Sequence, residues 1–308
     1  MMGMKNNCVF AFGGVGGSVT KFEKKLSKEQ KKKAKDCLER ASKCAEMDLL
    51  GYWYNREFYS DLDKYFAEWV LTYTYDCILF EEAMNKGYQP DLLMGYSLGL
   101  NTALVCGEVI TYEDGVKILE GVKECARAGF VTEEREMGII IGITKECLVK
   151  MIHKNHFEEK VAIGSQNSEE GFIVSGCKKE ILTILEQAEQ AGVLKARALE
   201  VPYSFHDGKI NPEYMQKYFN NVSLLDMKNA KYPIMSVYSQ NIMQDAKTLR
   251  EELNLNVHSS MNWNTSIKKL ENMGYSRYMD ISLDYTLKKI SEFEREGVEF
   301  LTYKNILQ

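Results

Sequence analysis

The segment GYSLG at residues 95 to 99 places Ser97 between two glycines. It follows the apolar run Leu92–Met94 and precedes helix-forming residues, which predicts a strand, a sharp turn and a helix. Glycines leave out side chains that would collide in such a turn, so the serine hydroxyl would be exposed at a helix start. The pattern therefore indicates a serine nucleophile, although so short a motif also arises by chance.

A serine hydroxyl needs a base to attack at neutral pH, and the chain has four histidines. His206 follows the segment 202–205, where we expect the chain to re-enter a large domain, and it is our candidate base. His153 and His156 lie among charged residues with no further Cys or His nearby, and His258 lies in a polar stretch. We expect these three to be surface residues, and no metal site is predicted.

A second glycine-rich segment, GGVGG at residues 13 to 17, follows the apolar run 8–12. It lacks the Gly-Lys-Ser/Thr of a phosphate loop, and Val19 stands where a dinucleotide-binding loop has its third glycine. Two interpretations stay open. The segment is either a plain turn or a loop whose backbone N–H groups form an oxyanion hole, with the N–H of Leu98 as second donor.

The elements expected between residues 131 and 200 follow the order βαββαβ of a ferredoxin-like unit. They are strands near 138–143, 161–166, 171–176 and 194–199 and helices near 145–154 and 178–191. We therefore predict an α/β protein, with an α/β-hydrolase-like large domain (1–130 and 201–308) built on a parallel-sheet core. The ferredoxin-like subdomain (131–200) would be inserted into it.

Composition excludes several classes of protein. The 308 residues are 45% hydrophobic and 27% charged, as in soluble globular proteins. The net charge of -5 gives no general attraction to nucleic acids or anionic membranes. We expect no signal peptide, the sequence contains no apolar membrane-spanning run, and its eight cysteines include no CxxC pair. We expect a cytoplasmic protein with reduced thiols.

The segment 22–44 is predicted to be a helix rich in lysine. Its basic residues form either a solvated helix face or a docking surface for an acidic partner. The lysines of its first half are Lys24, Lys25, Lys28, Lys31, Lys32, Lys33 and Lys35.

Taken in order, these pieces resemble the malonyl-CoA:acyl-carrier-protein transacylase family, which includes discrete acyltransferases and acyl hydrolases of trans-acyltransferase polyketide synthases. The resemblance covers nearly the whole chain. The family motifs FPGQGSQ, GHSLGE and AFHS are matched by residues 12–18 (FGGVGGS), 95–100 (GYSLGL) and 204–207 (SFHD). The family's Asn and SG-ending strand are similar to Asn167 and residues 173–176, and its late polar residue and QW pair to Asn256 and residues 262–263.

The resemblance implies a role for each matched residue. Ser97 would be the acylated nucleophile and His206 the base that later acts as acid. The backbone carbonyl of Asn256 would hold the imidazole tautomer, and the N–H groups of Val15 and Leu98 would form the oxyanion hole. The substrate pocket would include Trp69, Tyr96, Val122, Asn167, Ser204 and Phe205.

Departures from the family pattern bear on the acyl group. Malonyl-selecting members bind the free carboxylate with an arginine, and Val122 stands at that position. Lys123 lies about 100° further around the helix and lacks the planar fork of arginine. At four further positions where the family has a polar residue, this chain has an apolar or aromatic one, namely Val15, Trp69, Tyr96 and Leu100. We therefore expect an acyl group without a terminal carboxylate.

The leading hypothesis is a serine acyltransferase of polyketide or fatty-acid biosynthesis that moves an acyl group between CoA or carrier-protein thioesters through acyl-Ser97. One alternative is an acyl-carrier-protein hydrolase with the same Ser–His site. Others are a malonyl transacylase whose carboxylate site uses Lys123 or Arg127, and a non-catalytic carrier-binding module. We expect a monomer without a bound cofactor, whose acidic carrier-protein partner docks through Lys24, Lys28 and Lys32.

Overall fold

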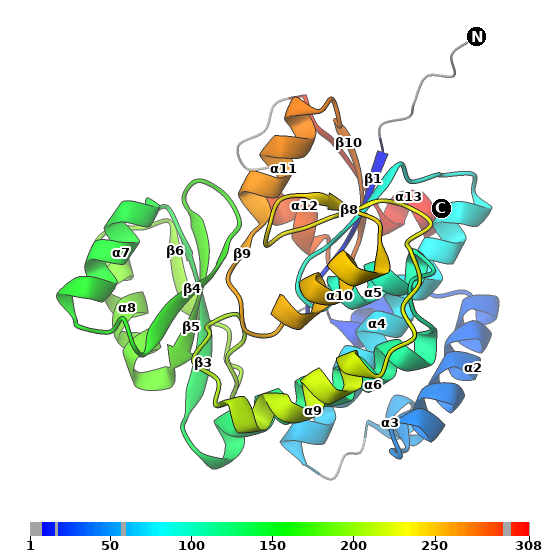
Figure 1. Ribbon diagram of the computed structural model, residues 1–308, viewed down its shortest axis with the longest axis horizontal. Helices are drawn as coiled ribbons and strands as arrows, with labels where there is room; N and C mark the ends of the chain where they lie inside the picture. Colours follow the sequence, from blue (N-terminus) through cyan, green and yellow to red (C-terminus); the bar gives the residue numbers. More distant parts are fainter. Residues whose placement is uncertain (1–7, 16–17, 57–59, 292–296, 308) are drawn as a thin grey trace.

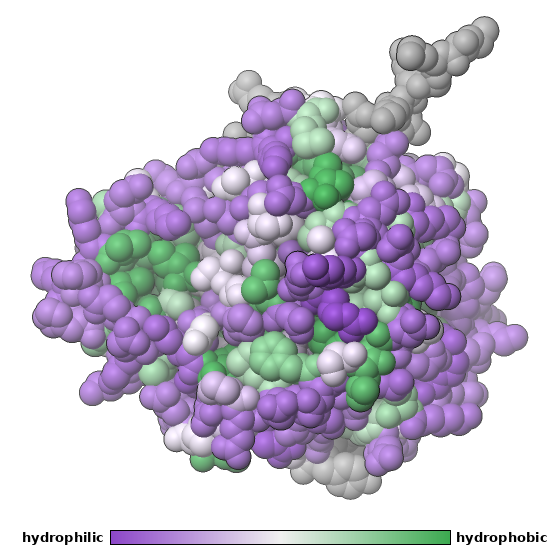
Figure 2. Space-filling view, viewed as in Figure 1, coloured by the Kyte–Doolittle hydropathy of each residue, from purple (hydrophilic) through white to green (hydrophobic). Residues whose placement is uncertain are grey.

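The computed structural model of the chain describes residues 8–15, 18–56, 60–291 and 297–307 (Figure 1). They form a large part with a six-stranded sheet and a smaller part with a five-stranded sheet. None of the helices in the described ranges is long and apolar enough to cross a membrane. Figure 2 shows mostly hydrophilic residues on the face in view, with one group of hydrophobic residues over the small part at the left.

The large sheet has the strand order β11-β10-β1-β2-β7-β8. Its first five strands are parallel and β8 is antiparallel to β7. The central strand β1 alternates its side chains between two buried faces. Phe10 and Phe12 pack in the cluster that contains α4 and α5, whereas Val9 and Ala11 pack against residues of α11 and α12. The strands are β1 (Cys8–Phe12), β2 (Leu92–Gly95), β7 (Ile234–Met235), β8 (Ile242–Met243), β10 (Arg277–Ile281) and β11 (Glu299–Thr302).

Helices cover both faces of this sheet (Figure 1). The long helix α4 begins at a side-chain cap by Ser60, and α6 begins with a capping box of Thr111 and Asp114. The helices of the large part are α1 (Val19–Glu23), α2 (Lys28–Cys44), α3 (Leu49–Asn55), α4 (Asp61–Asn85), α5 (Gly99–Cys106), α6 (Tyr112–Val131), α9 (Pro212–Ser223), α10 (Ala246–Leu255), α11 (Trp263–Asn272), α12 (Thr286–Ser291) and α13 (Tyr303–Leu307).

The small sheet has the order β6-β3-β5-β4-β9. The elements β3 (Arg135–Ile141), α7 (Lys145–Lys154), β4 (Val161–Gln166), β5 (Gly171–Cys177), α8 (Lys178–Gln190) and β6 (Lys195–Ala198) follow in the predicted order βαββαβ. Their antiparallel pairing confirms the ferredoxin-like interpretation. The short strand β9 (Met261–Asn262) adds to β4 in parallel and so joins the two parts. The boundaries at residues 130 and 200 stay a prediction.

Two predicted helices are shorter than expected. The helix predicted over residues 22–44 is two helices, because Ser27 and Gln30 form a capping box that starts α2 at Lys28. Lys24 therefore lies at the end of α1, outside the helix that carries Lys28 and Lys32. The last predicted helix, residues 284–295, begins at Thr286, and residues 292–296 lie outside the described part.

Candidate active site

The turn between β2 and α5 presents Ser97. Its φ of 55° lies in the left-handed region, which only a tightly constrained turn holds for a non-glycine residue. A Cβ at Gly95 would lie 2.3 Å from the Cα of Leu100, and one at Gly99 would lie 2.0 Å from the carbonyl oxygen of Phe12. Both glycines are therefore required by backbone contacts, as the sequence pattern predicted.

His206 lies in hydrogen-bond contact with this serine. Ser97 Oγ is 2.9 Å from His206 Nε2, and His206 Nδ1 is 3.2 Å from the carbonyl oxygen of Ser259. Because a carbonyl only accepts, Nδ1 carries the proton and Nε2 accepts from the Ser97 hydroxyl. Burial lowers the pKa of His206 to about 4, so the imidazole is neutral at pH 7 and is able to act as a base.

The carbonyl that orients His206 belongs to Ser259, so the prediction that Asn256 supplies it is wrong. The carbonyl and the side-chain oxygen of Asn256 instead accept from the hydroxyl of Tyr238, at 3.2 and 2.9 Å. Asn256 ends α10 and lines the pocket beside His206. The family motif indicated the right segment. Every residue of that segment has a backbone carbonyl, so the sequence could not show that the one facing His206 belongs to Ser259 and not to Asn256.

Val15 and Leu98 lie in the loops that follow β1 and β2. Because these strands are parallel neighbours, the two loops meet at one sheet edge. A Cβ at Gly14 would lie 3.3 Å from Ser97 Cβ, so the loop after β1 lies close to Ser97. Among the described residues, the N–H groups of Val15 and Leu98 have no acceptor. They are available for a ligand oxygen. Residues 16 and 17 of the glycine segment lie outside the described part.

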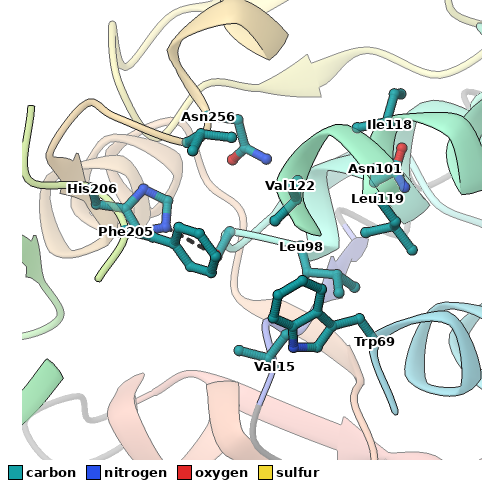
Figure 3. Close-up of a pocket in the computed structure, with 12 residues that line it drawn as sticks. Val15, Trp69, Leu98, Asn101, Ile118, Leu119, Val122, Phe205, His206 and Asn256 are labelled. Atoms are coloured by element: carbon teal, nitrogen blue, oxygen red, sulfur yellow. Dashed lines mark hydrogen bonds between the residues drawn. The ribbon is translucent and has the colours of Figure 1, made fainter. Parts of the chain in front are cut away.

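A pocket opens beside Ser97 and His206, and its other walls are mainly apolar (Figure 3). Of the predicted substrate residues, Trp69, Val122 and Phe205 line it. The indole of Trp69 is 3% exposed and meets the ring of Phe205 at 5.9 Å. The sequence analysis missed four lining residues, which are Asn101, Ile118, Leu119 and Val257. Ile118 and Leu119 precede Val122 by one turn of α6, so helical spacing from that position would have found them.

Comparison with known proteins supports the same fold. No protein-family model matches the chain. A malonyl CoA-acyl carrier protein transacylase of Bacillus subtilis is 26% identical over 273 residues, which cover 88% of this chain and 85% of that protein. A solved malonyl CoA-acyl carrier protein transacylase of Coxiella burnetii superposes with a TM-score of 0.84 at 20% identity, over 97% of this chain and 95% of that one.

The chain is thus similar in sequence and in fold to malonyl CoA-acyl carrier protein transacylases. A further structure, of a type II polyketide synthase acyl-carrier protein in complex with its malonyl-transacylase, has a TM-score of 0.82 at 18% identity, over 96% of this chain and 95% of that one. The predicted α/β fold and the predicted acyltransferase class are thereby confirmed.

The cations near the family's arginine position are paired elsewhere. Lys123 Nζ lies 2.6 Å from a carboxylate oxygen of Asp63. The guanidinium of Arg127 makes two hydrogen bonds to Glu124, at 2.7 and 3.0 Å. Neither lines the pocket, and no other Lys or Arg of the described residues does so.

Three predicted substrate residues, Tyr96, Asn167 and Ser204, are not among the residues that line this pocket. The hydroxyl of Tyr96 donates to the side-chain oxygen of Asn167 at 2.9 Å, and the Tyr96 ring packs edge-on against Trp263. Ser204 likewise makes a structural contact, because its hydroxyl accepts a hydrogen bond from Nε of Arg135 at 2.6 Å. These contacts join the small sheet to the large part, and a substrate role for the three residues stays a prediction.

Proposed function

We propose that this protein is a serine acyltransferase that moves an acyl group without a free carboxylate between thioesters of CoA and of an acyl carrier protein. The observation that carries the proposal is the 2.9 Å contact of Ser97 Oγ with the neutral imidazole of His206, beside a pocket without a described cation. The names of its relatives support carrier-protein acyl transfer. The pocket walls favour a neutral acyl group, because an unpaired carboxylate is costly in apolar surroundings.

In the proposed mechanism, His206 Nε2 takes the proton of Ser97 as Oγ attacks the thioester carbonyl. The N–H groups of Val15 and Leu98 donate to the oxyanion of the tetrahedral intermediate. The C–S bond then breaks, the thiol leaves with the proton from His206, and the acyl group stays on Ser97 as an ester. An incoming thiol reverses these steps and carries the acyl group away.

The direction of the hydrogen bond between His206 and Ser259 fits these reaction steps. Ser259 accepts from Nδ1 and so stabilises the imidazolium that forms during attack, as a carboxylate does in a catalytic triad. Burial lowers the pKa of the free imidazole, and the carbonyl of Ser259, which carries only a partial charge, offsets this effect only in part.

Docking of an acidic carrier protein through Lys24, Lys28 and Lys32 forms part of the proposal. All three are exposed, and none forms an ion pair with a described residue. Their segment packs against α4 and α6, the helices that contribute Trp69 and Val122 to the pocket. Electrostatic attraction there would raise the rate of encounter.

Intact-protein mass spectrometry tests the reaction. The protein is incubated with acetyl, malonyl and longer acyl thioesters, and then with a holo carrier protein. We expect a neutral acyl adduct that moves to the carrier and is absent from Ser97→Ala. An adduct that decays to free acid regardless of carrier would make the protein a hydrolase. A preferred malonyl adduct would contradict the neutral acyl group, and acylation of Ser97→Ala would overturn the site. No adduct from any thioester would favour a non-catalytic carrier-binding module.

A further inference from the structure

One polar group in the pocket wall has no partner. Asn101 lies one helical turn after Ser97 on α5, is 1% exposed and lines the same pocket. In Figure 3 it lies beside Ile118 and Leu119, at the end of the pocket away from His206. Its side-chain oxygen Oδ1 is buried and has no hydrogen-bond partner among the described residues. The mechanism proposed above makes no use of it.

The orientation of this amide is fixed by its other end. Asn101 Nδ2 donates to the carbonyl oxygen of Gly115 on α6, at 2.9 Å. A flipped amide would set two acceptor oxygens against each other, since a carbonyl cannot donate. The NH₂ group therefore faces Gly115, and Oδ1 is the atom left without a donor.

Leaving a buried acceptor unpaired costs about 1–3 kcal/mol, and native proteins rarely tolerate it. Ile118 and Leu119, which lie beside Asn101 in Figure 3, offer no donor because their side chains are aliphatic. The missing donor is thus one that an occupant of the pocket would bring. An ammonium group would enter without a counter-charge, whereas a hydroxyl donates one hydrogen bond and carries no charge.

We propose that Asn101 recognises a hydroxyl on the acyl chain, so that the preferred substrate is a hydroxyacyl thioester whose O–H donates to Asn101 Oδ1. This inference rests on the proposed acylation of Ser97 and narrows its substrate class. Because Asn101 lies at the end of the pocket away from His206 in Figure 3, the hydroxyl would lie some bonds away from the reacting carbonyl. A 3-hydroxyacyl group is the first candidate, and 2- and 4-hydroxyacyl groups bracket it.

The test compares each hydroxyacyl-CoA with its deoxy partner, for example 3-hydroxybutyryl with butyryl. We expect at least one hydroxyacyl thioester to acylate Ser97 with a kcat/KM about 10-fold higher than its partner, the worth of one hydrogen bond to a buried group. Asn101→Leu and Asn101→Ala should remove this preference. Asn155→Leu, which changes a half-buried asparagine of the small part that bonds to Gln187, is the matched control and should retain it.

Equal rates for every pair in the unmodified protein would overturn the inference, as would a preference that survives in both Asn101 variants. Calorimetric binding of the same pairs to Ser97→Ala separates this from failure of the proposed reaction. A tighter Kd for the hydroxyacyl thioester, lost on further substitution of Asn101, would support recognition even if no acyl-enzyme forms. Equal Kd values would count against it.

Discussion

Burial keeps the imidazole of His206 neutral at neutral pH, because desolvation is the main cause that lowers its pKa to about 4. The unfolded value is about 6.5, so the unfolded chain binds more protons between these two values. The neutral imidazole therefore contributes stability above about pH 6.5 that is lost as the pH falls through about 4.

The same pKa predicts the pH dependence of acylation. We expect the rate of acyl-Ser97 formation from a small thioester to stay level from pH 7 to about 5 and to fall through about pH 4. His206→Ala should slow it at least about 100-fold at pH 7, the usual worth of a general base. Time courses by intact mass measure both. His153→Ala changes an exposed histidine and should have no effect; a rate that already falls through pH 6.5 would contradict a buried base.

At the residue scale, we expect Trp69 to limit the length of the acyl chain. Its indole lines the pocket and is held edge-on between Tyr203, at 5.5 Å, and Phe205, at 5.9 Å. Trp69→Ala should lower stability by about 3–5 kcal/mol and open space for longer chains, each added methylene being worth about 0.8 kcal/mol when buried. We expect the ratio of octanoyl to acetyl acylation to rise about 10-fold or more. Trp53→Ala, outside the pocket, should leave the ratio unchanged; an unchanged ratio in Trp69→Ala would remove Trp69 from specificity.

At the scale of elements, strand β3 supports the segment that carries His206. Arg135 is buried at the start of β3 and lies 2.9 Å from Asp207, the residue after His206. Asp207 also accepts from the backbone N–H of Lys209 and from the Ser204 hydroxyl. Strand β4 packs on the same segment, since a Cβ at Gly164 would lie 3.4 Å from His206 Cβ. The small sheet thus holds the candidate base against the large part.

Arg135→Met should leave Asp207 as an unpaired carboxylate next to His206. The charged and titratable groups that act on His206 are Asp207 on its own segment and His258 before β9. Loss of the arginine should raise the pKa of His206 by about one unit and move the acidic limb of the acylation profile upward. In the double variant Arg135→Met/Asp207→Asn, the acidic limb should return to its position in the unmodified protein. Lys160→Met, which breaks the pair with Glu180 within the small part, is the control. A lower rate with an unmoved limb would indicate a merely structural role.

The sequence predicted the elements whose periodicity or glycine spacing is strong, and it missed those that depend on tertiary contacts. The βαββαβ unit and the elbow at Ser97 belong to the first kind. Strand β10 belongs to the second, because its residues RYMDI include Arg277 and the buried Asp280, and only its place between β1 and β11 makes it a strand. The family motifs likewise led to Ser97 and His206. The role of the Ser259 carbonyl and the unpaired oxygen of Asn101 depend on tertiary contacts and are visible only in the structure.

At the scale of the whole molecule, exposed lysines lie at distant places in a chain of net charge -5. Lys28 and Lys32 lie one turn apart on α2, at the right in Figure 1, whereas Lys145 and Lys150 lie on α7 at the far left. All four are exposed and form no ion pair with a described residue. The two lysine pairs therefore allow the same change of charge at two distant places.

Reversing the charge of the α2 pair, in Lys28→Glu/Lys32→Glu, should slow acyl transfer to a holo carrier protein about 10-fold at low salt. Acylation by a small thioester should be unaffected, because steering acts on the encounter with a charged partner. The difference should shrink as salt shortens the screening length to about 8 Å at 0.15 M. The variant Lys145→Glu/Lys150→Glu changes the net charge equally and should transfer normally. If both variants slow transfer alike, overall charge rather than α2 determines the encounter; if neither does, the carrier protein docks elsewhere.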